Sequence, residues 1–404
     1  MSHPGTRPRV LMVASFPPPL TGQTMATQAF ARWAEEVAEV RRLNLADPLR
    51  HQRPSGRFSW SQLRRVADVR SEIVHSTNGL LDDGHGSTTA DEARWDVGYL
   101  TLASSGLGSI RDLLLLRALR PRVDQLVVHI HQGSFAGAMS GPFRAPSRQA
   151  LLGRVDRFLF IAGTLAAQAS WVPAARRRIV PNPSGEGTRF TDEEVEAARE
   201  RRTTTGPFRI LFLANPLPEK GHERLLQALP LLRERLDTGA LEAAGREIRV
   251  DVVGAWPSDA VRTDYTRRAT GLAHRCEVEV HGAVSDRSRI RALLASAHVL
   301  AFPSTYREEG APLAVIEALG AGTPVLATRH GALPEMVEDG RSGLILDPVD
   351  PPALAAGLAT LADRTAWPAF SRAARARYRE RFAPDAVRTA FLDALLDPGP
   401  RGRP

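Results

Sequence analysis

The stretch Ile210–Leu226, ILFLANPLPEKGHERLL, decides how the second half of the chain folds. Its first five residues, Ile210–Ala214, are apolar and predict a short buried strand, and a helical pattern begins at His222. Between them, Asn215–Gly221 contains two prolines and a glycine, which favour a loop. This loop holds Lys220, the only lysine among the 53 basic residues of the chain. The stretch therefore predicts a strand–loop–helix unit with a single ammonium group in its loop.

Short apolar runs alternate with helical patterns along both halves of the chain. In the first half, strand patterns occur at Val10–Ala14, Val40–Leu45, Val97–Leu102, Leu126–His131, Phe158–Ala162 and Ile179–Val180. In the second half, they occur at Ile210–Ala214, Arg249–Val253, Glu277–His281, Val299–Phe302, Val325–Thr328 and Gly343–Leu346. Helical patterns lie between them, for example at Thr24–Val37, Gln149–Asp156 and His222–Arg235. Such alternation is typical of parallel sheets, so the two series predict an α/β protein with two Rossmann-like domains.

The boundary between the two series lies in a polar stretch. Residues 185–207 combine turn-forming residues with a short, highly charged helical pattern, and this composition is typical of a linker. We therefore expect the first domain at residues 1–184 and the second at residues 208–372. A further helical pattern, residues 384–396, follows the second series.

Composition and short motifs exclude several classes of protein. The chain is 43% apolar and 24% charged, as is ordinary for a globular protein, and it has no run of about 18 apolar residues that would predict a membrane span. The single cysteine, Cys276, fits a reducing cytoplasm. The net charge of +8 comes from scattered arginines, without a nucleic-acid-binding motif. The glycine motifs of dinucleotide oxidoreductases and P-loop NTPases are also missing.

A second segment, Glu309–Gly322 (EGAPLAVIEALGAG), predicts a buried helix. Pro312 suits the first turn of this helix, and Gly320 suits its end. Between these two residues only Glu317 is polar, so the helix is apolar on all sides and its one carboxylate needs hydrogen-bond donors. Two sources of donors remain open, namely a pair of ribose hydroxyls or one of the many arginines.

The start of this helix and the loop with Lys220 are predicted to lie at one edge of a sheet. Each segment follows a strand, and the ends of parallel strands gather at one edge, where ligands bind. Backbone N–H groups at a helix start attract phosphate, and a lysine ammonium neutralises a leaving diphosphate. Glu309 is suited to accept bonds from sugar hydroxyls. On position alone, an ordinary acidic residue at Glu309 and a lysine placed by chance are equally compatible with the sequence.

Three segments together resemble the retaining glycosyltransferases of family four, which have the GT-B fold. The segments are ILFLANPLPEKG, VHGAV, and the long run from FPSTYREEG to RSGLIL, with Glu309 and Glu317 as the E-x7-E signature. The resemblance covers residues 208–372 closely. It covers the first half more loosely, through PPPLTGQT, VVHIHQGSF and IVPNPSG. The resemblance implies two Rossmann-like domains facing a cleft, with the helix at 384–396 packing back on the first domain.

The resemblance implies roles for residues of both halves. Lys220 would contact the donor diphosphate, Glu309 the hydroxyls of the donor sugar, and Glu317 the ribose. The segment before and at the helix start would hold the phosphates through Gly310, Ala311, Pro312, Leu313 and Ala314. The main chain after the strand ending at His281 would meet the base through Gly282, Ala283 and Val284. In the first half, His131 would lie beside the reacting sugar, and Gly22 would line the cleft near the diphosphate.

Two positions need separate comment. Asn215 stands where the family usually has an arginine on the diphosphate, and asparagine donates hydrogen bonds without bringing charge. His131 and His129 lie on one face of a predicted strand, so a metal-ligand pair or a structural role remain alternatives to a role beside the sugar. We find no third ligand near them in sequence and no D-x-D motif. We therefore expect no metal and no cofactor.

The resemblance implies an enzyme, a retaining hexosyltransferase that moves a sugar from a nucleotide diphosphate donor to a hydroxyl acceptor. Cell-surface polysaccharide or glycolipid assembly fits the basic charge, and a lipid-linked acceptor remains open. We expect a cytoplasmic protein, with a peripheral contact at the inner face of the membrane left open. Two alternatives stand beside this interpretation. One is an isomerase or phosphorylase of the same fold, and the other is a non-catalytic nucleotide-sugar-binding protein.

Overall fold

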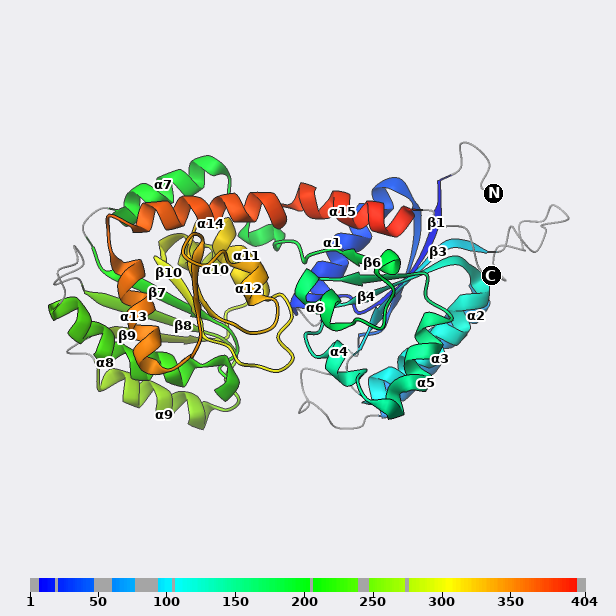
Figure 1. Ribbon diagram of the computed structural model, residues 1–404, viewed down its shortest axis with the longest axis horizontal. Helices are drawn as coiled ribbons and strands as arrows, with labels where there is room; N and C mark the ends of the chain where they lie inside the picture. Colours follow the sequence, from blue (N-terminus) through cyan, green and yellow to red (C-terminus); the bar gives the residue numbers. More distant parts are fainter. Residues whose placement is uncertain are drawn as a thin grey trace, which may run out of the picture. The chain divides into compact units, whose positions relative to one another are not determined.

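The computed structural model describes residues 7–18, 21–46, 60–76, 94–103, 106–203, 206–238, 247–272 and 276–397. The chain divides into two compact units (Figure 1). The first unit contains the residues up to Asn182 together with those from Val387 onward, and the second contains Pro183–Ala386. The first unit is therefore built from two separate stretches of sequence.

The first unit is a parallel sheet between layers of helices. Its described strands are β1 (Arg9–Ala14), β2 (Glu39–Asn44), β3 (Trp95–Leu102), β4 (Val123–Ile130), β5 (Arg157–Phe160) and β6 (Arg177–Ile179). They lie in the order β2-β1-β3-β4-β5-β6, and every neighbouring pair is parallel. The strand order reverses between β1 and β3, the kind of position at which ligands bind in open α/β sheets.

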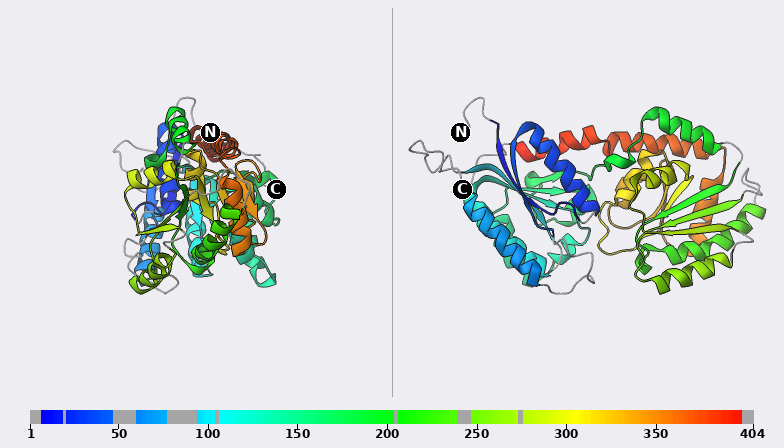
Figure 2. Two further views of the ribbon diagram at one scale, coloured as in Figure 1. Left: turned by 90° about the vertical axis from the view of Figure 1, so that its left-hand side faces the viewer. Right: turned by 180° about the vertical axis from the view of Figure 1, so that it is seen from behind.

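Helices cover both faces of this sheet (Figure 2). The longer ones are α1 (Gly22–Val37), α2 (Trp60–His75), α3 (Gly106–Leu119) and α5 (Ala145–Leu152), and the shorter ones are α4 (Phe135–Ala138) and α6 (Gly163–Gln168). Side chains of α1 and of strands β1, β3 and β4 share one buried cluster that includes Phe30 and Tyr99. Burying large apolar side chains of this kind stabilises a fold by about 1.5–3 kcal/mol each.

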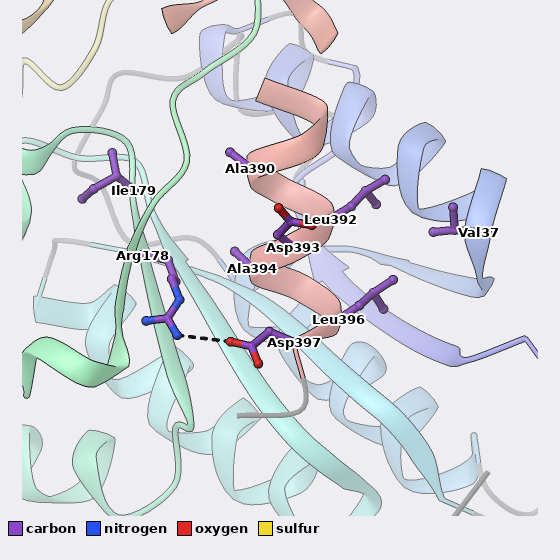
Figure 3. Close-up of a pocket in the computed structure, with 9 residues that line it drawn as sticks. All are labelled: Val37, Arg178, Ile179, Ala390, Leu392, Asp393, Ala394, Leu396 and Asp397. Atoms are coloured by element: carbon purple, nitrogen blue, oxygen red, sulfur yellow. Dashed lines mark hydrogen bonds and ion pairs between the residues drawn. The ribbon is translucent and has the colours of Figure 1, made fainter. Parts of the chain in front are cut away.

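The last helix, α15 (Pro384–Leu396), completes the core of the first unit. Phe391 is fully buried and stacks on Phe30 with ring centroids 4.5 Å apart. At the end of the helix, Arg178 of β6 forms an ion pair with Asp397, with 3.1 Å between nitrogen and oxygen (Figure 3). Arg157 of β5 donates to the carbonyl of Ala394 over 2.9 Å. The helix is thus held by an apolar face and by two arginines of the sheet.

The second unit repeats the architecture with a different strand order. Its described strands are β7 (Phe208–Leu213), β8 (Ile248–Val253), β9 (Glu277–Gly282), β10 (Val299–Phe302), β11 (Val325–Thr328) and β12 (Gly343–Leu346). The order is β12-β11-β10-β7-β8-β9, again with parallel neighbours. This is the doubly wound order of dinucleotide-binding sheets, and its reversal lies between β7 and β10. The loops that follow these two strands therefore meet where a ligand crevice is expected.

Helices pack on both faces of the second sheet (Figures 1 and 2). They are α7 (Asp192–Thr203), α8 (His222–Thr238), α9 (Asp259–Thr270), α10 (Arg287–Ser296), α11 (Leu313–Gly320), α12 (Leu333–Met336), α13 (Pro351–Ala362) and α14 (Trp367–Arg381). Helices α8 and α13 pack against each other over one shared apolar cluster. On another side, α11 packs against α14. Residues Val315–Gly320 of α11 are all buried, which agrees with a sequence that is apolar on every side.

The predicted strands all overlap strands of the structure, so the α/β prediction from the sequence is confirmed at this level. The helix predicted at Gln149–Asp156 is wrong in position, because α5 runs from Ala145 to Leu152 and ends at Gly153. Residues 185–203 and 206–207 of the predicted linker lie within the second unit, and Val195 and Ala198 of α7 are buried there. Within the described ranges, no helix has the length and apolar character needed to cross a membrane.

Candidate active site

The loop after β7 places Lys220 at the switch point of the second sheet. A short 3-10 turn, Pro218–Lys220, is closed by Gly221 in the left-handed conformation, with φ of +82°. A side chain at this glycine would bring its Cβ within 2.4 Å of the carbonyl oxygen of Pro303. The loop is tied to the segment after β10, because the N–H of Thr305 donates to the carbonyl of Glu219 over 2.7 Å. Glycine thus allows the two loops of the switch point to approach each other closely.

Lys220 and Glu309 form an ion pair in this position, and both side chains are largely buried. The Nζ atom of Lys220 lies 2.5 Å from Oε2 of Glu309, and the two side chains are 13% and 7% exposed. The hydroxyl of Ser304 donates to the same carboxylate oxygen over 2.6 Å. Nζ also lies 4.6 Å from the ring centroid of Tyr306. Two residues that are 89 positions apart in sequence are therefore brought together at this edge of the sheet.

The start of α11 follows this ion pair directly. Pro312 occupies the N-cap position and Leu313 is the first helical residue, so the prediction that Pro312 lies in the first turn is wrong by one position. The first N–H groups of a helix have no partner within that helix, and they carry the positive end of its dipole. Gly310, Ala311 and Ala314 offer little side-chain bulk around these groups. The arrangement is suited to holding an anion against the backbone.

Glu317 is buried within α11 and meets two donors from distant segments. Its Oε1 accepts a hydrogen bond from the hydroxyl of Thr188 over 2.9 Å and forms an ion pair with Arg287. The side chain of Glu317 is 3% exposed, whereas that of Arg287 is 33% exposed. Burial raises the pKa of Glu317 above its ordinary value, while the charge of Arg287 and the hydrogen bond from Thr188 act in the opposite direction. Of the two donor sources left open by the sequence, the structure shows the arginine.

Thr188 and Arg287 were not among the predicted site residues. Thr188 ends a short 3-10 turn, Glu186–Thr188, in the stretch predicted as a linker. Arg287 is the first residue of α10, which begins shortly after β9. The sequence signal for Arg287 was only that a buried carboxylate needs a cation, and the chain offers many arginines. Nothing in the sequence pointed to Thr188.

The remaining predicted donor residues lie at the same edge of the sheet. Asn215 follows β7, and its Oδ1 accepts a hydrogen bond from the N–H of Ala255 over 3.1 Å. Gly282 ends β9 with φ of +71° and accepts a hydrogen bond from the N–H of Gly254 over 2.9 Å. Ala283 is exposed and Val284 is partly exposed, just beyond this strand end. The amide of Asn215 therefore joins two loops of the edge rather than bringing a charge to it.

His131 and Gly22 belong to the first unit. Gly22 is exposed and begins α1, behind a capping box in which Thr21 and Thr24 exchange hydrogen bonds. His131 follows β4 and is buried, with its Nδ1 3.1 Å from Oδ1 of Asn182. Burial lowers the pKa of His131 to about 4, although the Asn182 side chain acts to raise it. The imidazole is therefore neutral at pH 7, where the carbonyl oxygen of Asn182 selects the tautomer that carries its proton on Nδ1.

The second ring nitrogen of His131 is then a hydrogen-bond acceptor. Its Nε2 is buried and has no hydrogen-bond partner among the residues that the structure describes. The neighbouring ring of His129 lies 4.2 Å away between centroids, and its Nδ1 contacts the hydroxyl of Tyr99 over 2.8 Å. Nε2 of His129 likewise has no hydrogen-bond partner among the described residues. The two residues differ in exposure, because His129 is fully buried whereas His131 is 8% exposed.

Replacing Asn182 with aspartate tests this tautomer. A carboxylate at the same place would raise the pKa of His131 from about 4 towards the neutral range, and protonation would turn Nε2 into a donor. We expect kcat/KM of the variant to fall as the pH is lowered through this raised pKa, and to recover at high pH. The wild type would show no such step between pH 6 and 8. A profile for Asn182→Asp that stays parallel to the wild type would contradict the assignment, and adding His131→Ala to the Asn182→Asp variant should remove the step.

One cluster outside the predicted site has the composition of a metal site. Asp251, Glu279 and His281 bring three ligand atoms within 4.8 Å of one another. His281 Nε2 already contacts Asp251 over 2.7 Å, and its Nδ1 lies 2.8 Å from a guanidinium nitrogen of Arg289. A guanidinium at that distance opposes a cation. The cluster is better explained as a network of hydrogen bonds between β8, β9 and α10.

Comparisons with known proteins agree with this architecture. Residues 207–364 match the protein family described as "Glycosyl transferases group 1". The chain is 33% identical over 207 residues to a glycogen synthase of Mycobacterium tuberculosis, a match that spans 50% of this chain and about half, 46%, of that protein. It is 28% identical over 300 residues to a GDP-mannose-dependent alpha-(1-6)-phosphatidylinositol monomannoside mannosyltransferase of Mycolicibacterium smegmatis, covering 72% of this chain and 74% of that protein.

The solved structures agree as well. Anabaena Alr3699/HepE in complex with UDP-glucose superimposes with a TM-score of 0.64 and 16% identity, over 96% of this chain and all of that one. The predicted α/β fold with two Rossmann-like domains is therefore confirmed. The comparisons thus show a segment similar to a family of glycosyl transferases and a fold shared with Anabaena Alr3699/HepE.

Proposed function

We propose that the protein transfers a sugar from a nucleoside diphosphate sugar to a hydroxyl acceptor, with retention at the anomeric carbon. One observation carries the proposal, namely the pairing of Lys220 with Glu309 at the switch point, directly before the start of α11. A cation, a helix start and a carboxylate at this place suit a diphosphate joined to a sugar. The family match over residues 207–364 covers the same segment.

In this proposal each part of the donor has its own group in the second unit. Lys220 leaves Glu309 and binds the diphosphate, while Glu309 accepts hydrogen bonds from the donor sugar. The backbone from Gly310 to Ala314 holds the phosphates. Glu317 accepts a hydrogen bond from the ribose through Oε2, since Thr188 and Arg287 both contact Oε1. The main chain of Gly282, Ala283 and Val284 meets the base, beside Asn215.

The chemistry follows from these assignments. The bond between the anomeric carbon and the diphosphate oxygen breaks, and the acceptor oxygen forms a new bond to the same face of that carbon. The departing phosphate oxygen takes the acceptor proton, so no second carboxylate is needed. Lys220 and the helix start stabilise the charge that develops on the diphosphate. His131 accepts a hydrogen bond from the sugar at Nε2, and Gly22 leaves room for the diphosphate. No step requires a metal or cofactor.

The relatives indicate which donors and acceptors to test first. One solved neighbour contains UDP-glucose, and one relative is described as GDP-mannose-dependent. Relatives described as a phosphatidylinositol monomannoside mannosyltransferase and as a colanic acid biosynthesis glycosyltransferase support an acceptor in glycolipid or cell-surface polysaccharide assembly. We therefore propose a lipid-linked or polysaccharide hydroxyl as the acceptor.

A screen of nucleotide sugars by thermal unfolding tests the donor. A ligand at about a hundred times its Kd stabilises the folded state by about 2.7 kcal/mol, so the true donor should raise the Tm of the second unit, a domain of about 200 residues, by about 5 °C or more. Release of nucleoside diphosphate is then measured with and without candidate acceptors. Acceptor-dependent release supports a transferase. Turnover that needs inorganic phosphate would indicate a phosphorylase instead, and donor binding without turnover would indicate a binding protein.

A further inference from the structure

The polar cluster at the end of β9 holds one histidine between charged side chains of three elements. Nε2 of His281 lies 2.7 Å from Oδ1 of Asp251 on β8, and Nδ1 lies 2.8 Å from a guanidinium nitrogen of Arg289 on α10. Nδ1 also lies 3.2 Å from a carboxylate oxygen of Glu279. The side chain of His281 is 4% exposed, whereas those of Arg289 and Glu279 are 54% and 63% exposed. The imidazole is therefore enclosed, while two of its charged partners reach solvent.

His281 stands directly before the segment that the proposed function assigns to the base. The register between β8 and β9 shifts at the strand end, where Val280 and Gly282 have successive partners on β8, so His281 is the extra residue of a β-bulge. Val280 packs against the core cluster, which leaves Glu279 and His281 on the opposite face of the strand. After the bulge, Gly282 takes φ of +71° and the chain turns towards α10. The side chain of His281 thus anchors the last residue before this turn.

The two protonation states of His281 require different arrangements of its partners. A carboxylate only accepts hydrogen bonds, so Asp251 fixes a proton on Nε2 in both states. In the neutral imidazole, Nδ1 is an acceptor and takes a hydrogen bond from Arg289. In the imidazolium, Nδ1 carries a proton, so it donates to Glu279 and repels the guanidinium. The imidazole therefore holds Arg289 only in its neutral form.

Further charged side chains around this strand end have partners of their own. These contacts are Arg262 with Asp259 on α9 at 3.1 Å, Asp286 with the N–H of Ser288 at the start of α10 at 2.8 Å, and Arg249 of β8 with Glu277 of β9 at 2.9 Å. Helix α9 packs against β9, and a Cβ at Gly282 would lie 3.5 Å from a guanidinium nitrogen of Arg262. The two arrangements of His281 therefore differ in the contacts of Arg289 and Glu279.

We propose that His281 is a positioning residue for the base segment, Gly282–Val284, and that its protonation releases this segment from α10. The inference rests on the proposed function, in which the segment meets the base. With the imidazole neutral, the contact with Arg289 joins the end of β9 to α10 across the segment. Arg287, which pairs with Glu317, begins the same helix. Protonation of His281 therefore loosens both the base segment and the partner of the carboxylate that binds ribose, and nucleotide binding weakens as the pH falls.

Titration of nucleoside diphosphates at different pH values tests the effect on binding. Histidine changes its charge between about pH 5 and 8, so the Kd of GDP and of UDP is measured by calorimetry over this range. In the wild type, the Kd should rise about five- to tenfold towards low pH, the effect of losing one hydrogen bond to a charged group. His281→Gln keeps a donor for Asp251 and an acceptor for Arg289 in an uncharged side chain, so its Kd should stay low throughout. Any step from Glu317 is common to both proteins, so their difference isolates His281.

Arg289→Ala tests the same contact from its other side and leaves His281 in place. Its Kd should equal the low-pH value of the wild type at every pH, and this variant decides the question if His281→Gln does not fold. Arg267→Ala and His75→Gln are the matched controls, since Arg267 is 72% exposed on α9 and His75 is exposed on α2. Both should keep the pH step of the wild type.

Hydrogen–deuterium exchange without nucleotide follows the segment itself. At low pH, protection of residues 282–290 should be about fivefold lower in the wild type than in His281→Gln, because only the wild type loses the contact with Arg289. At high pH the two proteins should exchange alike. Comparison at the same pH removes the intrinsic pH dependence of exchange.

Several results would overturn the proposal. Parallel pH curves for the wild type, His281→Gln and Arg289→Ala would show that protonation of His281 does not affect binding. Equal exchange in the wild type and His281→Gln at low pH would show that the segment is not released. A rise in Tm with zinc alone, in the wild type but not in His281→Gln, would show a metal site instead. Absence of binding by any nucleoside diphosphate would contradict the proposed function, whereas the exchange result would still stand.

Discussion

Replacing Lys220 with alanine is expected to lower kcat about 10²- to 10³-fold at saturating donor. Removing one preorganised donor of charge stabilisation from an active site typically costs this much, because the charge on the leaving group grows only as the reaction proceeds. Lys220 is the only lysine of the chain, and Asn215 in the same loop brings no charge to this edge. The effect should therefore appear in kcat more than in the Kd of the donor. Acceptor-dependent release of nucleoside diphosphate measures it.

Two further variants test whether the loss of activity in Lys220→Ala is specific to this lysine. Arg329→Ala removes another cation that follows a strand of the same sheet, but Arg329 is exposed and pairs with Asp347, so it should keep near wild-type activity. Lys220→Ala also leaves the buried carboxylate of Glu309 with Ser304 as its donor. The double variant Lys220→Ala with Glu309→Gln relieves that unpaired charge, and its Tm separates loss of folding from loss of chemistry. A folded Lys220→Ala protein that releases nucleoside diphosphate at the normal rate would refute the assigned role.

Replacing Glu317 with glutamine is expected to weaken donor binding by about 10- to 100-fold. A hydrogen bond to a charged acceptor contributes about 1.5–3 kcal/mol, and glutamine keeps the shape of the side chain while removing its charge. The same change leaves Arg287 without its ion-pair partner, but Arg287 still donates to the hydroxyl of Thr188 over 3.2 Å and is one-third exposed. Titration of the donor by calorimetry gives the Kd directly. Unchanged affinity in the glutamine variant would remove Glu317 from the donor site.

The pH dependence gives a second test of Glu317. Burial raises its pKa above the ordinary value, so the carboxylate takes up a proton at a higher pH than an exposed glutamate does. Donor binding should therefore weaken as the pH falls through this raised pKa, and the glutamine variant should lack that step. Arg287→Gln removes the charge that opposes the shift, so the step should move to higher pH. Arg291→Gln is the control, since Arg291 lies on the same helix and pairs with Glu194.

The sequence predicted the parts of the site that depend on strand order. Lys220 and Glu309 each follow an apolar run, and the doubly wound sheet places β7 beside β10, so the two side chains meet although 89 residues separate them. The apolar surroundings of Glu317 likewise predicted a buried carboxylate. The positions of these side chains could be predicted for two reasons. The period of apolar residues shows which positions are buried, and the ends of parallel strands gather at one edge of the sheet.

The remaining features of the site and of the fold depend on tertiary packing, which no local sequence pattern predicts. Thr188 lies in a turn whose sequence favours a linker, and it reaches Glu317 across 129 residues only because residues after Asn182 fold against the second sheet. Helix α5 has a weak apolar period, so its start at Ala145 was misplaced by four residues. The tautomer of His131 depends on Asn182, which is 51 positions away. Such contacts are consequences of the tertiary fold.

Helix α15 gives the chain an unusual order of assembly. The ring of Phe391, which stacks on Phe30, leaves the ribosome after the whole second unit has been synthesised. Most residues of the first unit precede the second unit, so part of the apolar core of the first unit stays uncovered until the residues after the second unit have been synthesised. The second unit is one continuous stretch of sequence, so all of its residues have been synthesised before Phe391. Synthesis therefore favours folding of the later domain first, which reverses the usual vectorial order.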